Sequence, residues 1–391
     1  MIIKKFDFWL LGYILIASIF MVILMGSSIS AYMNDIYNPS YYIYQALLYS
    51  LAGFVIIVNR RKIYASRFIN VMWAFSIICF FFSFIQLSPF TIRSVISLLF
   101  NTFIIPISFL NGLWLGERLI AVKNRDLYLL LIQIPAIISM ISLRTFIEQG
   151  SWFHADAAFC VIVFMPFIFF FKRPWLSSIF AIVYVLFSLT SAKRSILITV
   201  FFCLTLFVLY LLRSRGKSRK GVVPNWFWIA IIAIIGAFFI INQSDILSHA
   251  RERSESLGGL IGDNGRYNIY SNILYDLSQS NLFQLLFGHG QMAVSRNIGV
   301  GGHNDLLEIF YDYGFVAVLL YFVVLLHFIL LAIRAFRCRQ YQHALRVGIS
   351  VSSIAFLGFF NCIITSTILE YSMFLALGCA IGLKEDSVIK T

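Results

Sequence analysis

The chain has 391 residues, of which 60% are hydrophobic and only 12% are charged, and its mean hydropathy is +0.88. A soluble domain ordinarily carries about 25% charged residues, so this composition excludes a soluble globular protein. A helix that crosses a bilayer needs roughly 20 apolar residues, and such runs follow one another here without the alternation typical of barrel strands. The sequence therefore predicts an all-α polytopic membrane protein with a single transmembrane domain over residues 1–391.

The formal net charge of +13 raises the question of a nucleic-acid partner. The basic residues fall in short segments between the apolar runs, where they serve as topology signals that face the cytoplasm, so no nucleic-acid partner is expected. The six cysteines show no CxxC spacing, which argues against a disulfide framework or a zinc site. No cofactor is expected.

About twelve apolar runs are expected to cross the membrane. The first, residues 8–25, follows Lys4 and Lys5 as in a signal peptide. The sequence Gly-Ser-Ser-Ile-Ser after it is a poor cleavage site, so this run is interpreted as an uncleaved span. The expected spans are residues 8–25, 41–58, 68–87, 92–115, 127–143, 157–171, 176–190, 195–212, 226–242, 304–333, 346–364 and 369–383.

The orientation follows from the excess of Lys and Arg in cytoplasmic segments of membrane proteins. Placing both termini in the cytoplasm puts most of the 30 basic residues on that side and leaves residues 243–303 as one extracytoplasmic loop between spans nine and ten. Loops this long are usually functional. We expect short amphipathic helices in it, one of them from about Arg266 to Phe287 with its apolar face on the membrane surface. The apolar positions of that helix are Tyr267, Tyr270, Ile273 or Leu274, and Leu277.

Some basic residues lie on the outer side, where the topology rule disfavours them. Lys193 and Arg194 stand at the outer mouth of the eighth span, and snorkelling of both side chains to the interface is one explanation. The other is a diphosphate clamp, because a guanidinium matches phosphate oxygens bidentately and a helix N-terminus favours an anion. Arg266 is likewise either a solvated arginine or a phosphate ligand at the start of its helix. The other loop arginines considered are Arg251, Arg253 and Arg296.

The end of the loop is rich in glycine and histidine. Gly288-His289-Gly290 and Gly301-Gly302 allow the backbone to approach a ligand closely, although glycine-rich loops are common. His303 is either an interfacial histidine or a general base toward a sugar hydroxyl, since an ordinary histidine pKa of about 6.5 suits that role. Asn304 can cap the helix that begins the tenth span.

Three acidic residues lie near the outer membrane boundary in this topology. Glu308 and Asp312 are one turn apart on one face of the tenth span, and Glu370 opens the last span on the same side. An ionisable residue at such a depth is a candidate for function. None of them forms a DxD-like pair, so no metal site is predicted.

Taken together, these residues resemble the family of O-antigen polymerases and O-antigen ligases of bacterial envelopes. The segments that carry the resemblance are Ser191–Ser195, Gly265-Arg266, Phe287–Gly290, His303-Asn304 and Gly314. The family pattern has Gly, Thr or Tyr three residues after that last glycine, and Ala317 departs from it. The close resemblance covers about residues 188–335.

The resemblance implies a metal-independent, inverting glycosyltransferase of the membrane-embedded GT-C type. It places the protein in the bacterial inner membrane with a periplasmic active site and an undecaprenyl-diphosphate-linked glycan as donor. Arg194 and Arg266 are then expected to hold the diphosphate, and His303 to position or deprotonate the acceptor hydroxyl. The residues expected to bind the substrate are Lys193, Arg251, Arg253, Gly288, His289, Gly290, Arg296, Asn304 and Glu308.

Three activities compete. A polymerase joins repeat units of O-antigen or capsule, whereas a ligase transfers finished polymer to lipid A-core. We favour the polymerase, because the divergent first half suits it and Arg251 followed by Gly262 resembles a polymerase pattern; such a polymerase is expected to act with a chain-length regulator. A transporter or flippase of lipid-linked sugars requires charged or broken helices near the midplane in both halves, and here the polar residues gather at one face.

Overall fold

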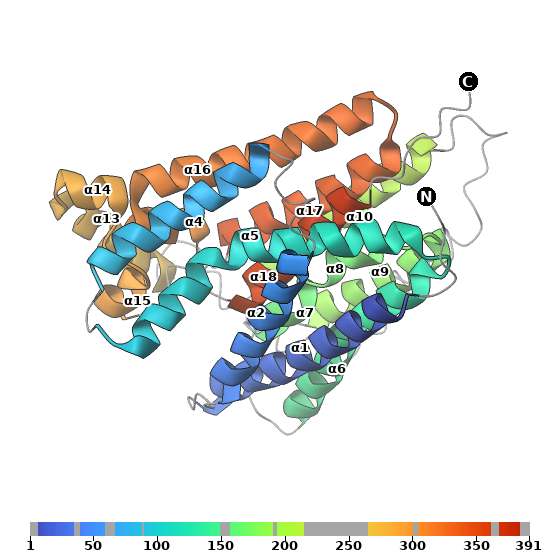
Figure 1. Cartoon of the computed structure of the whole chain (residues 1–391), viewed down its shortest axis with the longest axis horizontal. Helices are drawn as coiled ribbons and strands as arrows, with labels where there is room; N and C mark the ends of the chain where they lie inside the picture. The colour runs from blue at the N-terminus through green and yellow to red at the C-terminus, as the bar shows by residue number, and fades with distance from the viewer. Residues whose placement is uncertain are drawn as a thin grey trace, which may run out of the picture.

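The structure is a computed structural model that describes residues 7–34, 40–58, 67–87, 90–148, 157–190, 194–214, 265–299, 304–360 and 367–383. Nearly all of these residues are helical (Figure 1). The expected ninth span at residues 226–242 and the first part of the long loop lie outside the described residues.

The helices confirm the all-α class. Their bounds in chain order are α1 (Phe8–Asn34), α2 (Ser40–Val58), α4 (Arg67–Ile85), α5 (Ile92–Ala121), α6 (Arg125–Glu148), α7 (Ala157–Ile162), α8 (Met165–Ile168), α9 (Pro174–Thr190), α10 (Arg194–Ser214), α13 (Gly265–Gln279), α14 (Leu282–Phe287), α15 (Ala293–Ile298), α16 (Asp305–Arg337), α17 (Tyr341–Phe360) and α18 (Thr367–Gly382).

Several of these helices are suited to a membrane. Within the described part of the chain, four are long and apolar enough to cross one, over Phe8–Gly26, Ser94–Ala121, Arg125–Ser142 and Asp305–Arg337, and shorter apolar helices accompany them. The chain is therefore a helical protein with apolar helices that can span a bilayer, while the count of twelve spans stays a prediction.

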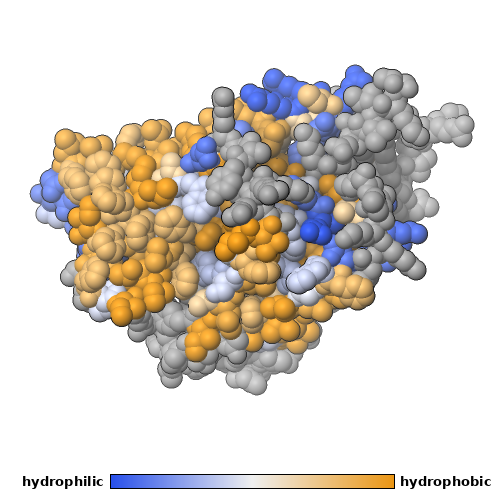
Figure 2. All heavy atoms as spheres, in the orientation of Figure 1, coloured by the Kyte–Doolittle hydropathy of each residue, from blue (hydrophilic) through white to orange (hydrophobic). Residues whose placement is uncertain are grey.

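The outer surface of the bundle has the same character. On α16, Phe315, Leu319 and Leu326 are each more than half exposed and lie on one helical face. Figure 2 shows apolar residues over much of one side of the molecule, with hydrophilic residues gathered toward one end. A surface of this kind is unfavourable in water, so its natural surroundings are lipid chains.

The span expected over residues 157–171 is broken in the structure. It forms α7 and α8, with a turn between them just before Pro166, which has no N–H for the helical ladder. The Gln133 amide donates to the carbonyl of Phe164 over 3.2 Å, and the Tyr184 hydroxyl donates to the Gln133 amide oxygen over 2.8 Å. The first bond adds a second donor to the Phe164 carbonyl, which also accepts the Phe167 N–H, and the second bond holds the Gln133 side chain in this apolar interior.

The helix expected over residues 266–287 is two helices, α13 and α14. Asn281 begins α14 with a capping box, in which its side chain accepts the Gln284 N–H and the Gln284 side chain accepts the Asn281 N–H. These local bonds end the first helix. Its Ile273 and Leu277 pack against α15 and α16 and are fully or nearly fully buried, so these two side chains do not rest on the membrane, whereas Leu274, the alternative to Ile273, is 56% exposed.

The two ends of the bundle differ in what they contain. At one end, which we call the terminal end, Arg346 of α17 donates to the carbonyl of Leu383 over 3.0 Å. The Arg118 guanidinium near the end of α5 forms an ion pair there with Asp7, at 3.1 Å, just before α1. The opposite end, which we call the loop end, carries α13, α14 and α15, at the left of Figure 1.

Glycines allow α5 and α18 to touch backbone to backbone in the centre of the bundle. A Cβ on Gly112 or Gly116 of α5 would meet the backbone of α18, and a Cβ on Gly378 or Gly382 of α18 would meet the backbone of α5. Small residues four apart are the usual means of close helix contact in membranes. This contact fixes α18, whose first turn reaches the loop end.

Candidate functional site

A break in α16 forms the base of the loop end. Gly314 has φ 81° and ψ 177° inside an otherwise helical segment, a conformation that favours glycine. A Cβ there would meet the backbone of Leu286 and Phe287 at the end of α14. The break therefore makes room for a distant part of the chain to lie against α16.

The segment that lies against the break is Gly288–Gly290. The His289 N–H donates to the Tyr311 carbonyl and the Gly290 N–H donates to the Asp312 carbonyl, both over 2.9 Å. Gly288 has φ 82°, and a Cβ on it would meet the backbone of Asp312. We call this arrangement the glycine clamp, defined by Gly288–Gly290 and Tyr311–Gly314. The close backbone approach that the sequence predicted for these glycines is made here to α16.

The His289 side chain strengthens the clamp. Its ring stacks on Tyr311 with 4.4 Å between ring centres. Its Nδ1 lies 3.0 Å from the Tyr311 carbonyl oxygen, and its Nε2 lies 2.9 Å from the Ser280 hydroxyl. The Tyr311 hydroxyl in turn donates to Asp276 of α13 over 3.0 Å. Both ring nitrogens of His289 therefore contact other groups of the protein. These contacts indicate that His289 holds the two segments of the clamp in position.

Three carboxyl groups are buried along the first turns of α16. Asp305, Glu308 and Asp312 are at most 2% exposed, and their spacing puts them on one helical face. The Asp312 Oδ1 accepts the Val294 N–H of α15 over 3.0 Å. Asp305 fills space beside α17 that a side chain at Gly358 would occupy. The prediction that Glu308 and Asp312 share a face of this helix is confirmed, and Asp305 was not foreseen.

Glu370, in the first turn of α18, completes this acidic group. It is 1% exposed, and neither carboxyl oxygen has a hydrogen-bond partner among the described residues. It lies within electrostatic range of Asp305, Tyr313 and Tyr321. A carboxyl group buried without hydrogen bonds costs free energy, and functional sites are places where such a cost is retained.

Asn304 has the capping role that the sequence allowed. Its side-chain oxygen accepts the N–H groups of Leu306 and Leu307 over 3.0 and 3.2 Å. Its amide nitrogen donates to the carbonyl of Phe359 over 2.9 Å. The start of α16 is therefore tied to the end of α17, and both ends of the Asn304 amide are used in that tie.

The predicted cations are described only in part. Arg194 is the first residue of α10, and Arg266 is the second residue of α13, both at the helix starts expected for them. The predicted residues that fall outside the described part of the chain are Lys193, Arg251, Arg253, Gly301, Gly302 and His303.

Contacts between helices show to which end of the bundle Arg194 belongs. Cys203 of α10 lies 3.4 Å from Ser353 of α17, and Phe202 packs on Phe356 with ring centres 4.6 Å apart. The numbers rise along α17 as they fall along α10, so the two helices are antiparallel. Arg194 therefore begins its helix at the end where α17 finishes, which is the loop end.

Arg296 is an exposed cation beside the clamp. It lies in the last turn of α15, where a positive charge suits the helix dipole. A Cβ on Gly290 would lie 3.5 Å from its Nη2, and the charge is within electrostatic range of Asp312. Of the predicted binding residues, Gly288, His289, Gly290, Arg296, Asn304 and Glu308 are described, and all lie at the loop end.

The described side chains of this site can donate and accept hydrogen bonds, carry protons and stabilise charge. No group of three His, Cys, Asp or Glu side chains in the described ranges is arranged to hold a metal ion. Comparison with protein-family models and with curated proteins finds no match for the chain.

Proposed function

We propose that the chain is a multi-pass glycosyltransferase of the bacterial inner membrane, which polymerises undecaprenyl-diphosphate-linked oligosaccharide repeat units at the periplasmic face. The observation that carries the proposal is the glycine clamp. Phe287–Gly290 and Gly314 are two of the segments on which the family resemblance rests, and they meet in space at the loop end. Asn304, from a third such segment, caps the same helix.

The proposed reaction is a single inverting displacement. The acceptor hydroxyl oxygen bonds to the anomeric carbon of the donor sugar while the bond from that carbon to the diphosphate oxygen breaks. The diphosphate leaves with the bonding electron pair, and Arg194 and Arg266 stabilise its charge. His303 accepts the hydroxyl proton. The cytoplasm holds both termini in this proposal, so the terminal end is cytoplasmic and the loop end is periplasmic.

The distribution of charge favours an enzyme over a transporter. The buried carboxyl groups lie at the loop end, and the ion pair of buried Asp7 with partly exposed Arg118 lies at the terminal end. The break between α7 and α8 is where alternating access would place a polar binding site. Residues 158–171 around it are all buried and mostly apolar, and its bonds come from the neutral side chain of Gln133.

Replacing Arg194 or Arg266 with alanine is expected to lower polymer formation by about 10²–10³-fold, the usual loss when one group that stabilises a developing anion is removed. Polymer made by membranes that contain each variant, with lipid-linked repeat units supplied, measures this, and immunoblotting checks that membrane levels are unchanged.

The matched control for this pair is Arg337→Ala. Arg337 is an exposed arginine in the last turn of α16, at the opposite end of that helix from the site. It is expected to leave polymer formation at the level of the unaltered protein. Normal long-chain glycan from either the Arg194 or the Arg266 variant would remove that residue from the proposed mechanism.

A further inference from the structure

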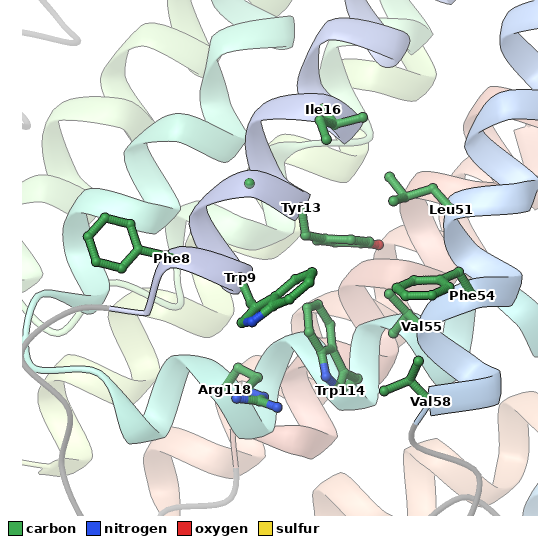
Figure 3. A pocket seen from close by; sticks show the side chains of 11 residues that line it. Phe8, Trp9, Tyr13, Ile16, Leu51, Phe54, Val55, Val58, Trp114 and Arg118 are labelled. Carbon is green, nitrogen blue, oxygen red and sulfur yellow. The ribbon is translucent and has the colours of Figure 1, made fainter.

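A cavity of about 310 Å³ lies at the terminal end, away from the site described above. It is formed by α1, α2 and α5, and its lining includes Phe8, Trp9, Tyr13, Phe54, Val58 and Trp114 (Figure 3). Its size is at the lower end of the range of ligand pockets, which is roughly 300–1,000 Å³.

The mouth of this cavity faces the outside of the bundle. Phe8, Trp9 and Val58 are each more than 60% exposed although they line it. Aromatic residues of this kind gather at the boundary between lipid chains and water, and α1 begins its apolar segment at Phe8. The walls are therefore open to the lipid of one leaflet, at the depth where acyl chains meet head groups.

Two hydrogen-bond donors stand at one edge of the cavity. Figure 3 shows the indole nitrogen of Trp114 and the guanidinium of Arg118 on the same side of it. The Trp114 Nε1 is buried and has no hydrogen-bond partner among the described residues. Arg118 is held over the Trp114 ring, 5.8 Å from its centre, and against Asp7. The Trp114 N–H is therefore covered by the protein, and the partly exposed guanidinium of Arg118 is the donor at this edge that a ligand can reach.

The ion pair leaves capacity on Arg118 for an acceptor that comes from a ligand. Its Nη1 donates to Asp7 Oδ2 over 3.1 Å, and its side chain is 37% exposed. A guanidinium carries five N–H donors in a planar fork that matches phosphate oxygens. Asp7 Oδ1 accepts the N–H groups of Trp9 and Leu10, so the contact with Arg118 uses only the other carboxyl oxygen and one guanidinium nitrogen.

The sequence that precedes α1 and the sequence that follows α2 are both basic. Lys4 and Lys5 come shortly before Phe8, and Arg60, Arg61 and Lys62 come shortly after Val58. Basic residues next to a transmembrane helix attract anionic lipids. Charge complementarity thus selects an anionic occupant over a zwitterionic one.

We infer that this cavity binds an anionic phospholipid of the surrounding leaflet, with an acyl chain between α1 and α2 and the phosphate on Arg118. Clefts between transmembrane helices that combine apolar walls with basic residues are suited to such lipids. The inference stands apart from the proposed glycosyl transfer, because it concerns the opposite end of the bundle.

Gly12 offers a way to fill the cavity without disturbing the fold. It lines the cavity, and a Cβ built on it would meet nothing within 4 Å. In the Gly12→Leu variant the new side chain occupies space that the acyl chain would take. Gly53 of α2 also has open space around its Cβ and is not part of the lining. Gly53→Leu is therefore the matched control, with the same change in helix propensity.

The test places the full chain in phosphatidylcholine nanodiscs and measures quenching of tryptophan fluorescence by brominated lipids. Brominated phosphatidylglycerol is expected to quench the unaltered protein and Gly53→Leu with a preference of about tenfold over brominated phosphatidylcholine, because both lipids carry the phosphate but only phosphatidylglycerol carries a net negative charge. Gly12→Leu is expected to lose that preference. Trp9→Phe is expected to remove most of the preferential quenching, because Trp9 lines the cavity.

Two results would overturn the inference. Equal quenching of the unaltered protein by the two brominated lipids would show that the cavity does not select an anionic lipid. An undiminished preference in Gly12→Leu would show that the selected lipid binds elsewhere. Arg118→Gln supplies the second line of evidence, since the phosphatidylglycerol preference should fall while quenching by phosphatidylcholine stays the same.

Discussion

The Gly378→Leu variant is expected to unfold at a clearly lower temperature than the unaltered protein. A Cβ at this position would meet the carbonyl of Phe109 and the Cα of Gly112 on α5, which are backbone atoms that cannot move aside without separating the two helices. Overpacking of a core costs about 3 kcal/mol, which corresponds to a fall in apparent melting temperature of about 5–10 °C. Glu370 lies in the first turn of α18, at the loop end. Displacement of α18 would therefore also move the Glu370 carboxyl away from the other buried carboxyl groups.

Thermal unfolding of the purified protein in detergent, followed by tryptophan fluorescence, measures this effect. Gly53→Leu is the control, since a Cβ there meets nothing within 4 Å, and it should unfold at the temperature of the unaltered protein or slightly above. If Gly378→Leu unfolds at the same temperature as Gly53→Leu, the close contact between α5 and α18 does not hold the bundle together.

The Gly314→Ala variant is expected to open the glycine clamp and to stop polymer formation while the protein still inserts into the membrane. A side chain at φ 81° costs about 1–2 kcal/mol. The new methyl group would also meet the backbone of Leu286 and Phe287. The N–H groups of His289 and Gly290 should then lose their carbonyl partners on α16 and exchange with deuterium much faster.

Gly299→Ala separates strain from contact. Gly299 also has a positive φ of 86°, but with ψ −7° it lies in the left-handed region, where alanine carries a smaller backbone penalty than at Gly314, and a Cβ there meets nothing within 4 Å. Hydrogen–deuterium exchange of the peptide that contains residues 288–290, measured for both variants beside polymer formation, distinguishes the two causes. Protection of that peptide in Gly314→Ala equal to that in Gly299→Ala would mean that the clamp does not depend on the close approach.

Much of the helical architecture follows from the sequence, because long apolar runs allow little else in a membrane. The interruptions do not follow in the same way. The apolar pattern of α16 continues through Gly314. The spacing of apolar residues therefore does not predict the non-helical backbone at this glycine. The end of α13 at Gln279 depends on a capping box formed by Asn281 and Gln284, whose local bonds compete with a helix that hydrophobic spacing alone would extend.

The sequence predicted which residues belong to the candidate site, but it predicted their arrangement in space only in part. Asn304 and Glu308 were recognised because polar residues at a membrane boundary stand out in an apolar chain. Asp305 was missed because its burial depends on Gly358, a glycine of α17 that leaves the space for it. The structural role of His289 was missed for a similar reason, since its partner Tyr311 is distant in sequence and becomes a neighbour only through the clamp.

The most direct test of the proposed function is the glycan ladder of a strain of the source organism that lacks this gene and carries either the unaltered gene or the His303→Ala variant. The account predicts a full ladder with the unaltered gene, and with the variant only lipid A-core capped by a single repeat unit. Uncapped core with polymer accumulating on undecaprenyl diphosphate would identify a ligase in place of a polymerase. A ladder that is unchanged by deletion of the gene would contradict glycosyl transfer altogether and favour transport of lipid-linked sugars.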